Sequence, residues 1–340
     1  MALSERGTVI FLKRFKLLLL CLGLALLALM IHQIGLGNIL KEISQLGFNI
    51  VFILIPYCFV YLLDALAWRT TLREKAREIQ FPHLFLTRMA GEAINYITPS
   101  AYLGGEPVKA YLLQKHGIPL VDGLASVVTA KTVMVIAQVF FVLLGIGLSF
   151  ASHPNDRGII YAAILIVILV SLAATFLVFA QHRGMFAGLL WLLELMRLPA
   201  GFLKRREDKL KHLDATILTF YGQHQLGFLL TLIFFFLGWL VGSLEIYLLL
   251  YYLDLSFDLR TAVSLEALVL VIRAAVFFIP SGLGAQEGGN ILLFASFGFS
   301  PVTAMTFSMV RRMREVIWIS IGLLYLAKQD IGVVQYREDG

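Results

Sequence analysis

The chain has 340 residues, of which 59% are hydrophobic and only 15% are charged. Because a soluble globular domain carries about 25% charged residues, this composition excludes an ordinary soluble enzyme or binding module and favours a protein embedded in a membrane. The net charge of +6 does not indicate nucleic-acid binding, since the basic residues flank apolar segments and no nucleic-acid motif accompanies them.

Apolar segments of about 20 residues, the length that crosses the hydrocarbon core of a bilayer, occur along the whole chain. We expect crossings at Phe15–Ile34, Phe48–Trp68, Leu120–Phe150, Ile159–Ala180, Leu226–Leu253, Leu259–Ile279 and Pro301–Ala327. Basic residues precede the first segment and follow the second, and short basic loops stay in the cytoplasm. The sequence therefore predicts an all-α, polytopic transmembrane bundle in the inner (cytoplasmic) membrane, with its N-terminus in the cytoplasm.

The segment Phe81–Lys115 is long enough to cross the membrane but too polar and too broken to cross as one helix. Pro107 removes a backbone donor, and glycines nearby weaken the helix. Backbone that is not helical survives at membrane depth only where protein or a wet cavity surrounds it. We therefore predict a broken or re-entrant hairpin whose tip lies near Thr98–Gly105.

The chain is expected to form a single membrane domain, 1–340, with one extended polar insert. This connector, about 184–225, separates a first half, about 1–150, from a second half, about 226–340. Apolar residues recur in the connector at helical spacing, with charges between them. The pattern fits an amphipathic helix in the cytoplasmic interface, and it fits a solvated connector equally well.

A gapless shift of 181 positions superimposes a second segment on the first hairpin. The shift pairs Pro99 with Pro280, Ser100 with Ser281, Glu106 with Glu287, and Lys131 with Arg312. Polar matches at one constant offset indicate an internal duplication, and interrupted segments at matching positions of two halves point to a transport site. Our count of four crossings between the halves makes the copies parallel, whereas a miscount by one makes them inverted, so both arrangements stay open.

The two predicted hairpin tips have the composition of an anion site. Glycines let backbone amides approach a ligand, and a half-helix that starts at the tip directs its positive dipole end there. Charged residues inside apolar spans must face one another or a polar cavity, and no acid within one turn accounts for Lys131 or Arg273. The predicted substrate-binding residues are Asn95, Thr98, Ser100, Gly104, Gly105, Glu106, Lys109, Lys131, Arg273, Ser281, Gly284, Glu287, Arg311 and Arg312.

Some of these features have simpler interpretations that stay open. The glycine-rich tips also suit close helix packing. Arg311 and Glu315 are spaced for an ion pair within one helix. Asp64, which lies one turn before Trp68, suits an anchor at the membrane interface.

The acids inside apolar spans are expected to have partners. Glu106 and Glu287 can neutralise cations, cap a half-helix, titrate during transport or meet a cationic headgroup, and the sequence does not separate these roles. Glu245 and Glu266 are lone acids that we expect to pair with Arg273 or Lys131.

Catalytic and metal motifs are absent from the sequence. The seven histidines lie at span ends or in loops without metal-ligand spacing, and the two cysteines lie inside apolar spans. There is no HExxH motif, no nucleophile elbow and no Walker loop. We therefore expect no metal, no cofactor and no enzyme activity.

The hairpin motifs carry a family resemblance. The motif elements are Asn95-x-x-x-Pro99, Gly104-Gly105-Glu106-x-x-Lys109, Pro280-x-Gly-Leu-Gly284-x-x-Glu287 and the upstream Arg273. Over nearly the whole chain they resemble the lysylphosphatidylglycerol synthase transmembrane (flippase-like) family. Gln286-Glu-Gly-Gly289 followed by Arg311-Arg312-x-Arg314-Glu315 is similar to the hopanoid-associated branch of that family.

The resemblance implies two re-entrant segments around a polar cavity and movement of a modified lipid between leaflets. The sequence departs from the family in having Lys109 and Lys131 where arginine is frequent, and lysine cannot form a bidentate fork on phosphate. The cytoplasmic aminoacyltransferase domain of bifunctional members has no counterpart here. We therefore do not expect the chain to synthesise aminoacylated lipid.

Together these observations predict a flippase-like transporter of a lipid with a polar headgroup, such as a modified phospholipid, a polyprenyl-linked lipid or a hopanoid-type lipid. Its expected partners are membrane lipids and proteins of lipid biosynthesis. Two alternatives stay open. One is a membrane-embedded enzyme that modifies lipids, and the other is a non-transporting subunit of a lipid-assembly complex.

Overall fold

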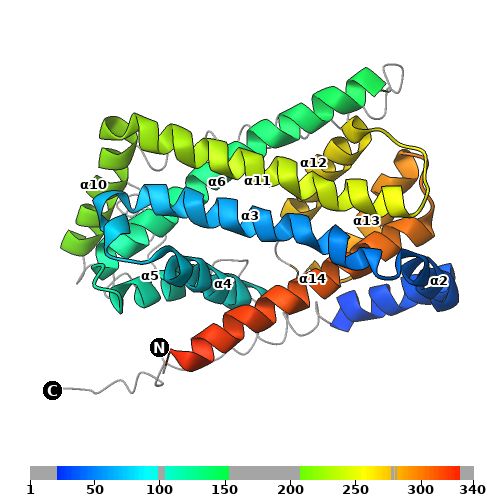
Figure 1. Cartoon of the computed structure of the whole chain (residues 1–340), viewed down its shortest axis with the longest axis horizontal. Helices are drawn as coiled ribbons and strands as arrows, with labels where there is room; N and C mark the ends of the chain where they lie inside the picture. Colours follow the sequence, from blue (N-terminus) through cyan, green and yellow to red (C-terminus); the bar gives the residue numbers. More distant parts are fainter. Residues whose placement is uncertain (1–20, 99–103, 153–206, 277–278, 280–281, 330–340) are drawn as a thin grey trace, which may run out of the picture.

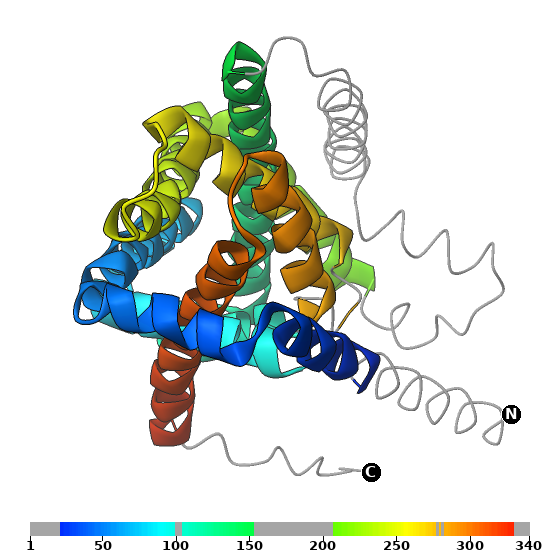
Figure 2. The ribbon, with the colours of Figure 1, turned by 90° about the vertical axis from the view of Figure 1, so that its right-hand side faces the viewer.

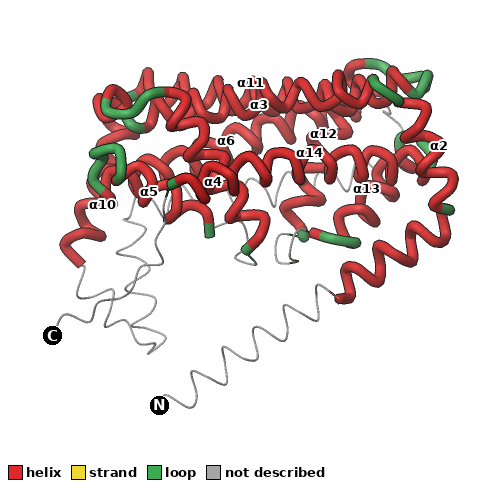
Figure 3. The backbone as a smooth tube through the Cα atoms, turned by 60° about the horizontal axis from the view of Figure 1, so that its bottom comes forward, coloured by secondary structure: helices red, strands yellow, loops and turns green. Residues whose placement is uncertain are grey.

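The computed structural model describes residues 21–98, 104–152, 207–276, 279 and 282–329. Every regular element in these ranges is helical (Figure 3), which confirms the predicted all-α class. The elements are α2 (Leu36–Leu46), α3 (Asn49–Thr71), the 3-10 helix η1 (Arg73–Arg77), α4 (Phe81–Ile97), α5 (Gly105–Gln114), α6 (Leu120–Ser152), α10 (Glu207–Gln223), α11 (Gln225–Tyr252), α12 (Leu259–Ala275), α13 (Ala285–Ser296) and α14 (Pro301–Lys328). The predicted site residues Ser100 and Ser281 and the predicted crossing Ile159–Ala180 lie outside the described residues.

Three of the described helices, α3, α6 and α11, are long and apolar enough to cross a membrane. The helical segment Cys21–Ile34 and α2 make a fourth crossing if they are counted as one, although they are bent by 81° where Gly35 interrupts them. α2 consequently lies across the end of the bundle (Figure 2). Large apolar side chains such as Phe48 and Leu292 are exposed on the outer surface, as lipid-facing side chains are. The protein is therefore a multi-pass membrane protein.

α3 and α11 form the central pair of the bundle and run in opposite directions. α3 starts beside α2 and ends at the opposite end of the molecule, where α10 lies (Figure 1). α11 starts beside α10 and returns toward α2 (Figure 1). The two helices pack against each other along their length.

Two pairs of shorter helices enter the bundle from its two ends. α4 starts and α5 finishes at the end of the bundle where α10 lies (Figures 1 and 3). In the same way, α12 starts and α13 finishes at the end where α2 lies. At a rise of about 1.5 Å per residue, α4 and α12 are about 25 Å long, and α5 and α13 are about 15–18 Å long. All four are shorter than the hydrocarbon core of about 30 Å. Their lengths fit the arms of the predicted re-entrant hairpins.

The hairpin helices are held by helices of the opposite half of the chain. α4 packs on α14, and α12 packs on α6. Small residues allow close contact at both places, because Gly145 of α6 lies against Ala267 of α12, and Gly322 of α14 lies against Met89 of α4. Each hairpin is thus positioned by both halves.

The helix boundaries follow the 181-residue offset of the sequence. Adding 181 to Thr71, the last residue of α3, gives Tyr252, the last residue of α11. Adding it to Leu120, the first residue of α6, gives Pro301, the first residue of α14, and α5 and α13 begin within one residue of the same offset. This correspondence supports the predicted duplication, and the opposite directions of α3 and α11 favour the inverted arrangement over the parallel one.

α10 is the described part of the predicted amphipathic connector. Leu213, Ile217 and Phe220 recur at helical spacing and are buried, the first two against Ala125 of α6. The apolar face of α10 is therefore covered by protein along α6.

Candidate functional site

Six charged residues from four helices meet between the first hairpin and the helices α3 and α6. We call them the first polar cluster; they are Asp64 of α3, Arg88 and Glu92 of α4, Glu106 and Lys109 of α5, and Lys131 of α6. Arg88 and Glu92 are four residues apart, and Glu106 and Lys109 three apart, so each pair shares one face of its helix. The helical periodicity of α4 and α5 thus directs four charges inward.

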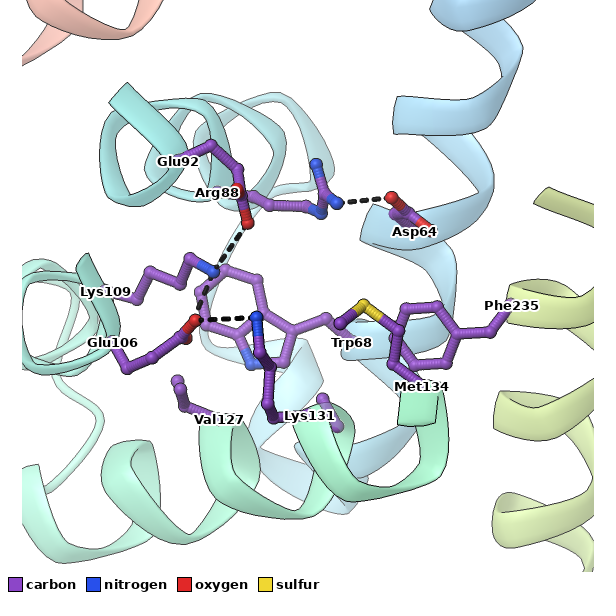
Figure 4. Close-up of a pocket in the computed structure, with 11 residues that line it drawn as sticks. Asp64, Trp68, Arg88, Glu92, Glu106, Lys109, Val127, Lys131, Met134 and Phe235 are labelled. Atoms are coloured by element: carbon purple, nitrogen blue, oxygen red, sulfur yellow. Dashed lines mark hydrogen bonds and ion pairs between the residues drawn. The ribbon is translucent and has the colours of Figure 1, made fainter. Parts of the chain in front are cut away.

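Ion pairs connect the first polar cluster (Figure 4). Lys109 Nζ lies 3.2 Å from Glu92 Oε1 and 3.1 Å from Glu106 Oε2. Lys131 Nζ lies 3.5 Å from the other oxygen of Glu106, so this carboxylate is shared by two lysines. Arg88 pairs separately with Asp64. With three cations and three carboxylates, the cluster has no net charge when all six groups are ionised.

The first hairpin is closed by Asn95 beside its tip. Asn95 Oδ1 accepts a hydrogen bond of 2.7 Å from the backbone amide of Gly105, and Asn95 Nδ2 donates one of 3.4 Å to Glu106. Gly105 lies directly on the backbone of Gly91, where a Cβ atom would overlap the Gly91 carbonyl. The close approach of α4 and α5 therefore requires glycine, and it places Glu106 at the start of α5.

A small pocket of about 30 Å³ lies inside the first polar cluster. The charged residues line one side, and Trp68, Met134 and Phe235 line the other (Figure 4). The Lys131 side chain is 31% exposed and the Glu106 side chain 13%, so this pair is accessible from the pocket. The pocket therefore has one polar side and one apolar side.

A second set of contacts links the two hairpins, and we call it the hairpin bridge. Arg273 of α12 donates a hydrogen bond of 2.6 Å to the hydroxyl of Tyr96 on α4, and this hydroxyl donates one of 3.4 Å to Glu315 of α14. Arg312 of α14 pairs with Glu287 of α13 at 2.7 Å and with Glu315 at 2.8 Å. The bridge therefore joins residues of both halves of the chain.

Glu287 also closes the start of α13. Gly284, with a φ of +77°, precedes the helix, and its backbone amide donates a hydrogen bond of 2.7 Å to Glu287 Oε2. The other carboxylate oxygen of Glu287 accepts from Arg312. The second hairpin thus uses its own glutamate as the anion at the helix start.

Four further charges form a buried ionic core made of Glu245, Glu266, Arg311 and Arg314. Arg311 lies 2.6 Å from Glu266 and 3.3 Å from Glu245, and Arg314 also pairs with Glu245. All four side chains are at most 3% exposed. Buried charges persist only when they are paired, so this core joins α11, α12 and α14.

The structure brings most of the predicted site residues into these three groups. Asn95, Gly105, Glu106, Lys109 and Lys131 gather at the first pocket, and Gly284, Glu287, Arg273 and Arg312 gather around the hairpin bridge. Thr98 ends α4, where its hydroxyl donates to the Ile94 carbonyl, and Gly104 precedes α5. Arg311 lies in the buried ionic core instead, away from the pocket.

Three pairings expected from the sequence are wrong. Arg311 pairs with Glu245 and Glu266, whereas Glu315 pairs with Arg312 of its own helix. The acids of the ionic core therefore do not meet Arg273 or Lys131, because the inward face of α14 presents arginines to them. Lys131 finds its acid on another helix, at Glu106.

The expected interfacial anchor at the end of α3 is also wrong. Asp64 lines the pocket beside Arg88, and Trp68 is 3% exposed, with its indole donating to Ser126 of α6. Arg88 and Glu92 were not among the predicted site residues. Their signal was available, because a cation and an acid four residues apart inside a span-length segment indicate one shared polar face.

Comparison with known proteins agrees with the hairpin motifs. Residues 15–322 match the family model described as the lysylphosphatidylglycerol synthase TM region. The chain belongs to this family. No solved structure matches the chain.

Curated relatives of this family member are UPF0104 membrane proteins. That of Methanothermobacter thermautotrophicus is 26% identical over 89% of this chain and 92% of its own length. Those of Pyrococcus horikoshii and Methanocaldococcus jannaschii are 24% and 25% identical, over 89% and 92% of this chain and 93% of their own lengths. The likeness to this family is thus spread over nearly the whole chain, and its hopanoid-associated branch stays a prediction.

Proposed function

We propose that the protein moves a lipid with a polar headgroup between the leaflets of the cytoplasmic membrane. The observation that carries the proposal is the pocket of the first polar cluster, where shared ion pairs line a cavity inside a bundle of apolar helices. Charges at membrane depth are costly unless paired, and they mark substrate pathways. On this proposal the small pocket widens as the headgroup takes the place of the Glu106 carboxylate beside Lys131, while the tails stay in lipid.

The hairpins supply the two sides of the path. α4–α5 opens toward the end of the bundle marked by α10, and α12–α13 toward the end marked by α2. Re-entrant segments at corresponding positions of inverted halves allow a site to face either side of the membrane by rocking of one half against the other. On this proposal, the headgroup passes from Glu106 and Lys131 of one half to Glu287 and Arg312 of the other.

The cations have distinct roles in the proposal. Lys131 holds the anionic part of the headgroup, because it faces a hairpin glutamate that the headgroup can replace. Arg312 keeps its partners Glu287 and Glu315 and contacts the headgroup with its remaining N–H groups. Lys109 keeps a second carboxylate, Glu92, and therefore positions the hairpin.

The orientation follows from the basic residues at the end of α3. Arg69, Arg73, Lys75 and Arg77 lie at the end of the bundle marked by α10. Short basic loops stay in the cytoplasm, so this end faces the cytoplasm. With the predicted crossing at Phe15–Ile34 ahead of α3, the N-terminus is expected in the cytoplasm as well.

Reconstitution tests the proposal. Purified protein is placed in liposomes that contain trace phosphatidylglycerol or phosphatidylcholine labelled on the acyl chain with a fluorophore that dithionite bleaches. The protein is expected to make the inner-leaflet label accessible within minutes, while protein-free vesicles retain it. Vesicles that retain the label for every lipid tested contradict transport by the protein alone and favour a subunit of a larger complex.

Mass spectrometry distinguishes the remaining alternative. Lipids that co-purify with the protein are expected to share one headgroup class that is enriched over the bulk membrane. The lipid composition of the proteoliposomes is expected to stay constant during the assay. Appearance of a new lipid species would instead favour a membrane-embedded enzyme that modifies lipids.

A further inference from the structure

The balance of charge in the first polar cluster constrains what can bind there. Its three carboxylates, on Asp64, Glu92 and Glu106, are matched by three cations. An anionic headgroup that entered this cluster would leave one negative charge unmatched in a medium of low dielectric, which is strongly unfavourable. A headgroup anion therefore needs an accompanying positive charge. In a cluster that contains carboxylates, a proton is the simplest one.

We propose that the first polar cluster carries one proton together with each anionic headgroup, and that Glu106 is the residue that takes up the proton. This inference rests on the proposed transport function. Water on the side to which the pocket is open supplies the proton, which binds a carboxylate oxygen of Glu106. The headgroup phosphate then takes the place of that carboxylate beside Lys131. The cluster has no net charge before binding, and none after it has taken up one proton and one headgroup anion. One lipid anion and one proton therefore cross the membrane together.

The contacts single out Glu106 among the three acids. Glu106 is the one carboxylate that pairs with Lys131 among the described residues, so its protonation releases that cation for a phosphate. Lys109 stays matched, because it also pairs with Glu92. Protonation of Glu92 would release no lysine, since Lys109 would still face Glu106. Protonation of Asp64 would leave Arg88 unmatched and deeper among the helices.

Glu106 faces charged and polar groups of three helices, its own included. Its own helix presents Lys109, α6 presents Lys131, and α4 presents Glu92 and Asn95. Asn95 Nδ2 can keep its hydrogen bond to the carbonyl oxygen of a protonated Glu106. The neutral acid is therefore not left without a partner at the pocket wall.

The corresponding pair of the second half lacks this property. Glu287 accepts from Arg312, but Arg312 also pairs with Glu315, and Glu287 accepts the Gly284 amide as well. Protonation of Glu287 would therefore leave Arg312 matched and disturb the start of α13. The two hairpins are related in sequence, yet of the two hairpin glutamates, Glu106 and Glu287, only Glu106 releases a cation when it is protonated.

The experiment uses wild-type proteoliposomes with a pH difference of one unit and trace labelled phosphatidylglycerol. One-to-one movement of the lipid anion with a proton predicts that the label accumulates about tenfold in the leaflet facing the alkaline side. Labelled phosphatidylcholine, which is zwitterionic, is expected to distribute evenly. A membrane potential set with valinomycin and potassium is expected to have no effect on either lipid.

Two outcomes separate the inference from the proposed function. If phosphatidylglycerol moves but distributes evenly at every pH difference, or follows the membrane potential, proton coupling is overturned while transport stands. If no lipid moves at all, the proposed function itself fails.

Variants then assign the proton to its residue. Glu106→Gln is expected to abolish the tenfold accumulation, because its amide takes up no proton. Glu78→Gln is the matched control, because Glu78 is exposed beyond η1 and pairs with Lys75 outside the pocket. The control is expected to accumulate lipid like the wild type. Tenfold accumulation by Glu106→Gln would overturn the assignment.

Discussion

Lys131 lies 3.5 Å from Glu106, a residue 25 positions before it and on the neighbouring helix. The same relationship recurs in the second half, where Arg312 lies 2.7 Å from Glu287, again 25 positions earlier. In each half the glutamate starts the returning arm of the hairpin, and the cation lies on the next long helix. The ion pair therefore occurs in both halves, each time beside the tip of a hairpin inside the bundle, as expected for a path with two matching binding sites.

The close contact of Gly105 with Gly91 predicts that even alanine at position 105 lowers the stability of the protein. Gly105→Ala is expected to separate α5 from α4, because the added Cβ would overlap the Gly91 carbonyl. Overpacking of this kind costs about 1–3 kcal/mol or more, and it would move Glu106 away from Lys131. Thermal unfolding in detergent and binding of labelled lipid are the measurements.

Gly147→Ala is the matched control, because nothing lies within 4 Å of a Cβ at that position on α6. It is expected to unfold at the wild-type temperature or slightly above, since alanine favours a helix over glycine. Equal stability of the Gly105 variant would contradict the close approach of the hairpin arms.

We expect that loss of Arg311 from the buried ionic core strongly lowers the free energy of unfolding. Arg311→Met leaves Glu266 without its partner at 2.6 Å and removes one partner of Glu245. Loss of one member of a buried ion pair is expected to cost about 3–5 kcal/mol. Arg260→Met, at an exposed position near the start of α12, is expected to leave the unfolding temperature unchanged.

A double variant checks that the cost arises from unmatched charge. Removal of both partners, as Glu266→Leu together with Arg311→Met, is expected to recover part of the stability lost in the single variant. If the two effects simply add, the pair does not interact in the way that the distances indicate.

The hairpin bridge predicts that one hydroxyl couples the two halves. Tyr96→Phe removes the acceptor of the Arg273 hydrogen bond and the donor to Glu315 without changing the size of the ring. The expected result is a fall in the rate of headgroup movement of about tenfold, since a hydrogen bond to a charged group contributes about 1.5–3 kcal/mol. Tyr111→Phe on α5, where the ring is 36% exposed, is the control and is expected to transport at the wild-type rate.

Asp258 caps the start of α12, and we expect the stabilisation from this cap to be lost in acid. Asp258 Oδ1 accepts hydrogen bonds of 2.7 Å from the amide and the hydroxyl of Thr261, and these bonds hold the pKa of Asp258 below its usual value. A lowered pKa stabilises the folded protein above the unfolded value of about 3.9, and this contribution is lost as the pH falls through the folded value. Asp258→Ala is expected to cost about 1 kcal/mol at neutral pH, and less in strong acid. A cost that grows on acidification would contradict the cap.

Local spacing made part of the site predictable from the sequence. The pairing of Glu106 with Lys109, at 3.1 Å, follows from a separation of three residues on one helix. The 181-residue offset also anticipated the corresponding helix boundaries of the two halves. The first follows from the helical repeat, which brings residues three apart to one face of a helix. The second follows from the similarity between two segments of the sequence.

The remaining contacts depend on which helices become neighbours. Asp64 meets Arg88 across two helices, and Glu245 meets Arg314 across a much longer separation. Nothing in the local sequence of Asp64 distinguishes an inward residue from an interfacial one, because α3 is apolar on all sides. The close packing of α4 on α14 and of α12 on α6 decides these partners, and helix-to-helix packing is not encoded in local spacing.

Headgroup movement by Lys131 variants in liposomes tests the central claim most directly. Wild-type protein is expected to move labelled phosphatidylglycerol across the bilayer, Lys131→Gln to reduce the rate at least tenfold, and Lys131→Arg to retain it, since Arg312 holds the corresponding place in the second half. Lys75→Gln, at a partly exposed position in η1 outside the pocket, provides the control. Equal rates for the wild type and the folded Lys131→Gln variant, or no movement by either, would contradict a headgroup path through the first polar cluster.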